Sequence, residues 1–190
     1  QLLLKVFGGS SLMNVEEVRF SRVWAMPSHK TFLIPPIARL LQEELQGVGI
    51  DPFAGSNSPA QVTNDLNPDM PTGTHQDALD FLRSQPSDSY DYSLLDPPYS
   101  ITQAAEMYAS YGLEKLRLGP HNMGYWAAIK NELARILKVN GKAICFGWSS
   151  MGLGKKRGFG LLRVLLVPHG GSKNDTIVTV EVKLAEEEAV

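Results

Sequence analysis

The tetrapeptide Asp96-Pro97-Pro98-Tyr99 has the residue types of a site that holds an amine on a planar ring. It follows the apolar run 90–95, which predicts a strand that the two prolines end. Asp96 supplies a carboxylate, the carbonyl of Pro97 lies between prolines without a competing donor, and Tyr99 supplies an aromatic face. We therefore expect catalytic groups at a strand end, where many α/β proteins carry them.

A second group of polar and small residues follows another short apolar run. Residues 48–50 predict a buried strand, and the loop after it begins with an acid and contains a glycine that lets a ligand approach the backbone. Residues 62–64 begin the next predicted strand, which places Asp65 at its end. The loop after the first strand comprises Asp51, Pro52, Phe53, Ala54 and Gly55.

The hydrophobic pattern predicts helices that alternate with strands, and hence an α/β sheet that is mostly parallel with an antiparallel edge hairpin. We interpret Asn140-Gly141 as a helix stop. The expected helices cover 36–46, 77–82, 102–110 and 126–137, the expected strands 48–50, 62–64, 90–95 and 142–146, and the hairpin 158–168 and 176–183.

The composition of the 190 residues narrows the class of protein to one soluble domain. The net charge of −2 disfavours a protein that coats nucleic acid non-specifically, so a nucleic-acid site must be a local basic patch. Cys145 lies in an apolar run and is expected to be a small buried residue, and no Cys/His cluster has zinc spacing.

Residues 1–12 end in a Gly-Gly-Ser-Ser stretch before Met13, and we expect them to be a vector-derived remnant. We therefore expect residues 13–190 to form a single domain. No apolar run has the length of a membrane span, and a cytoplasmic protein without membrane association is expected.

Together these motifs resemble the S-adenosylmethionine-dependent amino-methyltransferases of DNA, which act on adenine N6 or cytosine N4, and most of all the small, phage-like adenine enzymes. The resemblance implies a Rossmann-like class I methyltransferase domain, S-adenosylmethionine as cofactor and DNA with a flipped base as partner. It also implies that Asp96 and the Pro97 carbonyl accept hydrogen bonds from the target amine, while Tyr99 stacks on the base. Aspartate at the first position of the tetrapeptide favours adenine.

The same resemblance assigns the cofactor residues. The 51–55 loop would approach the methionine part of the cofactor, and Asp65, with Asn64 before it, would bind the ribose hydroxyls. Asp77-Ala78 would meet the adenine amine of the cofactor, and Phe32, from the segment 24–32, would close over its methionine end.

Several alternatives stay open at this stage. Asp51 and Asp65 are also typical turn or capping residues, and Asp77 could cap the short helix. The basic triplet Lys155, Lys156 and Arg157 could contact phosphates or form a solvated cluster. His29 and Lys30 could face substrate or solvent, and His169 and Lys173 could contact nucleic acid or form a simple turn.

The substrate also has alternatives, because the tetrapeptide recognises an amine on a planar group. Cytosine N4, RNA or a protein amide would suit the same chemistry. Asn57 stands where the family carries glycine, and only residues 58–60 separate the loop from the next strand. These two features motivate a rival function, a non-catalytic module that binds nucleic acid or protein.

Overall fold

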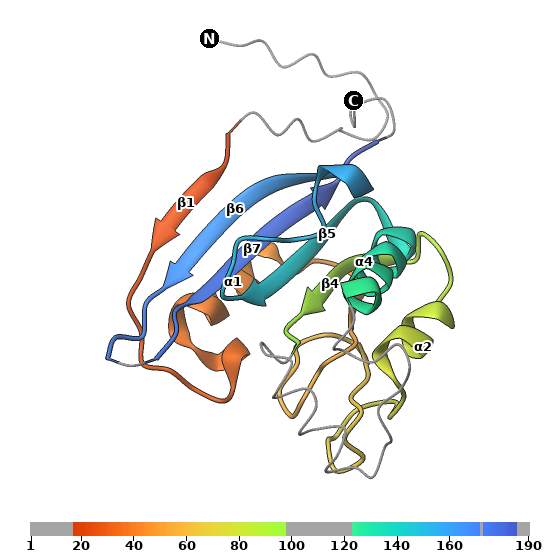
Figure 1. The fold of residues 1–190 in the computed structure, drawn as a ribbon, viewed down its shortest axis with the longest axis horizontal. Helices are drawn as coiled ribbons and strands as arrows, with labels where there is room; N and C mark the ends of the chain where they lie inside the picture. The colour runs from red at the N-terminus through yellow and green to blue at the C-terminus, as the bar shows by residue number, and fades with distance from the viewer. Residues whose placement is uncertain (1–16, 98–122, 172, 186–190) are drawn as a thin grey trace.

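The computed structural model describes residues 17–97, 123–171 and 173–185, which form a seven-stranded sheet with helices on both faces (Figure 1). The strand order is β1-β6-β7-β5-β4-β2-β3. The strands are β1 (Arg19–Arg22), β2 (Gly49–Asp51), β3 (Val62–Thr63), β4 (Tyr90–Leu95), β5 (Leu137–Gly147), β6 (Phe159–Val167) and β7 (Thr176–Lys183). The α-helices are α1 (Pro35–Glu44), α2 (Ala78–Arg83) and α4 (Met123–Ile136), and the 3₁₀ helices are η1 (Thr31–Leu33) and η2 (Lys155–Arg157).

Strand β7 runs antiparallel to both of its neighbours, β5 and β6, and every other described pairing is parallel. The predicted α/β sheet, mostly parallel with an antiparallel hairpin, is confirmed. The sequence did not predict β1, which pairs with β6 and forms the outermost strand on that side. All strands except β7 end at one edge of the sheet, which we call the carboxyl edge; the opposite edge is the amino edge.

The two faces of the sheet carry separate apolar cores. Helix α1 covers one face, where Ile37 and Leu40 are fully buried with side chains of β5 and β7. Helices α2 and α4 cover the other face, where Ile129 and Leu133 pack in one cluster with Cys145. Burial raises the pKa of the Cys145 thiol to about 12, in agreement with the buried, unreactive residue expected from the sequence.

The helix stop predicted at Asn140-Gly141 is wrong. Helix α4 ends at Ile136 and β5 begins directly at Leu137. Asn140 has a φ of 65° inside β5, where the β4–β5 register is irregular, so the Asn-Gly pair forms a kink within a strand. The helix predicted at 102–110 lies outside the described residues.

Residues 148–154, which we call the strap, connect β5 to η2 across the α4 face of the sheet. Leu153 is buried in that core, and its backbone N–H donates to the Glu181 carboxylate of β7. Gly154 N donates to the same carboxylate over 3.2 Å, and Lys130 Nζ of α4 donates to Gly152 O over 2.7 Å. The strap thus carries the chain from the carboxyl edge back to the amino edge, where β6 begins.

Within the described ranges, no helix combines the length and apolar character needed to cross a membrane.

Candidate active site

Asp51 ends β2 in the interior of the sheet and is completely buried. Its carboxylate accepts hydrogen bonds from Phe53 N at 2.9 Å and from Ser58 Oγ at 2.6 Å. Burial raises its pKa to about 7, and the charges of Asp96 and Asp65 act in the same direction. Asp51 therefore organises the loop at 52–61 and lies within electrostatic reach of both other acids.

Asn64 links the same loop to the next segment of chain. Its backbone N donates to Asp51 O and its carbonyl accepts from Ala54 N, each at 2.9 Å. The side-chain amide donates to Pro52 O and Gln76 O. Its oxygen accepts from Thr74 Oγ1 and from the backbone N of Gln76. Asn64 is fully buried and its side-chain hydrogen bonds are made within the protein, so it positions the loop; its expected contact with the cofactor stays a prediction.

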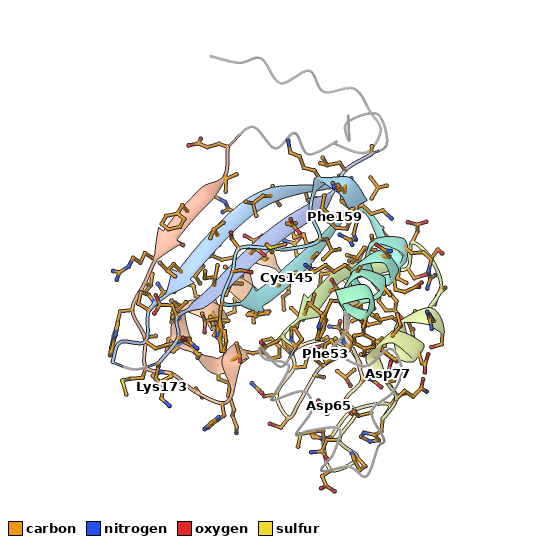
Figure 2. The ribbon with its side chains drawn as sticks, viewed as in Figure 1. Phe53, Asp65, Asp77, Cys145, Phe159 and Lys173 are labelled. Carbon is orange, nitrogen blue, oxygen red and sulfur yellow. The ribbon has the colours of Figure 1, made fainter. Side chains whose placement is uncertain are left out.

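Asp65 lies beyond β3 and is only partly buried. Its Oδ2 accepts from Gly55 N and its Oδ1 from Asn67 N, each at 2.9 Å. A carboxylate has about four lone-pair positions, so Asp65 keeps acceptor capacity toward a ligand. Figure 2 shows Asp65 at the carboxyl edge below Phe53.

Asp77 caps helix α2, as one of its two interpretations predicted. Its Oδ1 accepts from Leu79 N at 2.9 Å and from Asp80 N at 3.4 Å. Its Oδ2 accepts from the hydroxyl of Tyr125 on α4 at 3.0 Å. Ala78 is buried in the core behind the cap. Their contact with a cofactor stays a prediction.

Asp96 and Pro97 follow β4, which lies between β2 and β5 in the sheet. The strand order therefore brings Asp96 beside the Asp51 loop at the carboxyl edge, and the charges of the two acids interact. The structure thus joins two of the predicted motifs although 45 residues separate them in the chain. Pro98 and Tyr99 lie outside the described residues.

Three further residues shape the site without a clear sequence signal. Trp126 packs beside Phe53, with 5.9 Å between ring centroids, and Tyr125 packs edge-on against Trp126 at 5.4 Å. Helix α4 therefore presses its first turns against the loop after β2. Ser58 is the one of the three that lies in the loop itself. Its position seven residues after Asp51 matches no known sequence motif that would predict their hydrogen bond.

Phe32 lies in η1 and is 5% exposed. Its ring meets Phe146 of β5 edge-on, with 5.3 Å between centroids. Phe32 is therefore a core residue beneath the carboxyl edge, and its expected contact with the cofactor stays a prediction.

The basic triplet at 155–157 is not part of this site. It forms η2 directly before β6, and β6 runs parallel to β4 and begins at the amino edge. Figure 2 places Phe159, the first residue of β6, at the side of the sheet opposite Asp65. Arg157 is held by Asn131 Oδ1 at 2.7 Å and Leu153 O at 2.9 Å. The strap reverses the chain before the triplet and so places it at the amino edge, and its expected contact with phosphates stays a prediction.

In the part of the chain that the structure describes, no group of three His, Cys, Asp or Glu side chains has an arrangement that could hold a metal ion.

No protein-family model and no curated protein sequence matches the chain. Solved structures do resemble it. TrmN from Thermus thermophilus has a TM-score of 0.51 and 19% identity, over 80% of this chain and 49% of TrmN, so this chain spans about half the length of TrmN. The Burkholderia thailandensis 1,6-didemethyltoxoflavin-N1-methyltransferase, solved with bound 1,6-didemethyltoxoflavin and S-adenosylhomocysteine, has a TM-score of 0.56 and 12% identity, over 83% of this chain and 80% of that chain. The chain therefore has the Rossmann-like α/β fold of these methyltransferases.

Proposed function

We propose that this chain is an S-adenosylmethionine-dependent methyltransferase that acts on the exocyclic N6 amine of adenine in DNA. The observation that carries the proposal is the meeting of Asp96 with the loop of Asp51 and Asp65 at the carboxyl edge. Ligands of open α/β sheets bind outside this edge. Residues 96–99 resemble the tetrapeptide of the amino-methyltransferases, and this resemblance suggests methylation of an amine as the reaction. The fold is one that solved methyltransferases also have.

The residues of the loop suit the proposed cofactor. Gly55 has a φ of 55°, and a Cβ added there would meet no described atom within 4 Å, so the backbone is open to a ligand. Asp65 keeps lone pairs that could accept from ribose hydroxyls. The Nδ2 of Asn57 is buried and has no hydrogen-bond partner among the described residues, which makes it a donor that a cofactor could satisfy. When bound, S-adenosylmethionine supplies the electrophilic methyl group.

The residues after β4 would act on the target amine. An exocyclic amine is conjugated with its ring and is a poor nucleophile. As its nitrogen becomes tetrahedral during attack, positive charge develops on it, and the Asp96 carboxylate and the Pro97 carbonyl would bind this charge better than the neutral amine. The resemblance gives Tyr99 the role of stacking on the flipped base.

Two structural features also fit a rival function, a non-catalytic binding module. The connection from β2 to β3 contains no helix, and Asn57 lies within it. A degenerate methyltransferase that only binds nucleic acid or protein would have these features. Such a protein would give no thermal shift with millimolar S-adenosylmethionine, whereas the proposed enzyme is stabilised by it.

The experiment is a nucleoside digest. Unmethylated DNA is incubated with S-adenosylmethionine and the wild type, Asp96→Ala or the control Asp80→Ala, whose acid is exposed on α2. Mass spectrometry should find N6-methyladenine with the wild type and Asp80→Ala, and none with Asp96→Ala. N4-methylcytosine would reassign the base, and methylation of RNA or of a protein amide in place of DNA would overturn the substrate.

A further inference from the structure

A band of exposed aromatic, sulfur-containing and basic side chains lies along the carboxyl edge beside the proposed active site. We call it the rim and define it by Trp24, Met26, Lys30, Trp148 and Lys173. Trp24 is 58%, Met26 68% and Trp148 48% exposed, and both lysines are exposed. Figure 2 shows Lys173 at the same edge as Asp65 and Asp77. Several large apolar side chains that stay exposed along one edge of a fold are a candidate binding surface.

The fold fixes Trp24 on the β6–β7 turn. After β1 the chain continues along β6, with Val23 N donating to Leu166 O at 3.0 Å. The buried His169 ring of the turn bonds Ala25 O through Nδ1 at 2.8 Å. A carbonyl only accepts, so Nδ1 carries a proton, and Nε2 lies 2.9 Å from Thr176 Oγ1 in a second hydrogen bond. The Trp24 indole nitrogen lies 3.5 Å from where a Cβ on Gly170 would stand.

Lys30 and Trp148 are anchored over the end of β5. The carbonyl of Lys30 accepts from Leu33 N at 3.0 Å, which forms the turn that drives Phe32 against Phe146. Trp148 follows the last residue of β5. Because β5 is the neighbour of β4, this part of the rim lies closest to Asp96.

Acidic and basic side chains lie in different parts of the carboxyl edge. The cofactor side holds the acids Asp51, Asp65 and Asp77. The described residues of 22–34, 148–154 and 168–175 contain three Lys or Arg side chains, Arg22, Lys30 and Lys173, and one acid, Asp175; His29 is exposed and His169 is buried. The rim side is therefore basic, which suits a polyanion that crosses it.

The dimensions also suit a nucleic-acid strand. Three strand spacings separate β4 from β6, which is about 15 Å. A strand whose target base lies before Asp96 would continue over Lys30 and Trp148 toward Trp24 and Lys173. Exposed tryptophans stack on bases of any sequence, and lysines between them contact phosphates.

We propose that the rim binds the DNA strand that flanks the target adenine, with Trp24 and Trp148 stacking on unpaired bases and Lys30 and Lys173 contacting phosphates. This inference rests on the proposed function for the position of the target base. The basic triplet at 155–157 lies at the opposite edge and is not part of the rim.

The test measures binding of a fluorescein-labelled single-stranded 20-mer to the full chain by anisotropy over a series of salt concentrations. Trp24→Ala should weaken binding about ten-fold, and Trp24→Phe, which keeps an aromatic face, should restore most of it. Lys30→Ala with Lys173→Ala should reduce the slope of log K against log salt by about 1.4. The matched control, Lys155→Ala with Lys156→Ala, should change neither quantity. Because Trp24 is exposed, the melting temperature should stay at the wild-type value.

The opposite pattern, a loss in the control variant and none in the rim variants, overturns the proposal. A methylation assay distinguishes failure of the rim proposal from failure of the proposed function. DNA binding through the rim without N6-methyladenine would refute the proposed function and keep the rim, whereas equal methylation by the wild type and Trp24→Ala/Lys30→Ala/Lys173→Ala would refute the rim alone.

Discussion

The backbone N–H of Gly55 donates to Oδ2 of Asp65 over 2.9 Å, which ties the loop after β2 to the acid after β3. The other oxygen of the same carboxylate holds Asn67 N. One side chain thus positions both loops that would surround a cofactor, and its partial exposure leaves it available for a ligand.

Replacing Asp65 by alanine should therefore weaken cofactor binding and loosen the loop. We expect at least a ten-fold loss of affinity for S-adenosylmethionine in isothermal titration calorimetry. The free energy of unfolding should fall by about 1–2 kcal/mol, because two backbone N–H groups lose a charged acceptor. Asp69→Ala, which removes an exposed acid four residues further on, should leave both quantities unchanged. Equal affinity of wild type and Asp65→Ala would exclude Asp65 as a cofactor ligand.

Asp51 predicts a pH dependence of stability. Its pKa is about 7 when folded and 3.8 when unfolded, so the folded state binds more protons between these values. Stability should therefore fall as the pH rises from 3.8 through about 7 and then level off, by up to about 4 kcal/mol. Asp51→Asn should remove this component. The pKa of Glu181 is raised too, so the difference between wild type and Asp51→Asn in melts from pH 5 to 8.5 isolates Asp51. Parallel pH profiles would contradict the assignment.

Glu181 should be the main anchor of the strap. Alanine at this position leaves the N–H groups of Leu153 and Gly154 without their acceptor, one of them buried. Urea unfolding should show a loss of about 2–4 kcal/mol. The control is Glu43→Ala. Glu43 is half exposed, and in this variant Arg163 still forms its ion pair with Glu44. The free energy of unfolding should therefore fall by less than about 1 kcal/mol. Similar losses in both variants would mean that the strap is held by other contacts.

The thiol of Cys145 should be inert in the folded protein. Burial keeps its pKa at about 12, so almost no thiolate exists at pH 8. Ellman's reagent should give no colour with native protein and one equivalent in guanidinium chloride. Rapid reaction of the native protein would show that this region opens.

Local pattern predicted most of the elements, because apolar periodicity reports which faces become buried. The run at 90–95 is β4 with the same bounds, and the helix expected at 36–46 is α1. Strand β1 escaped prediction because it is short and Phe20 on it is 68% exposed. It is held by β6, about 140 residues away, and no local signal reports such a partner.

The site was predicted in part for the same reason. Asp51, Asp65 and Asp96 follow strands whose shared edge can be inferred from a parallel sheet. The Asp77–Tyr125 hydrogen bond joins residues 48 apart and has no sequence signature. The place of the triplet at 155–157 could not be inferred either, because nearness to β5 in sequence does not reveal that the strap reverses direction.

Strand β7 follows all the other described strands in the chain and lies between β5 and β6. During ribosomal synthesis β5 and β6 emerge before their common partner exists, and the Glu181 that secures the strap emerges with that partner. One edge of β5 and one edge of β6 therefore stay unpaired until residues 176–183 have been synthesised. Residues 176–183 complete the sheet, and a chain truncated before them lacks the strand that joins its two parts.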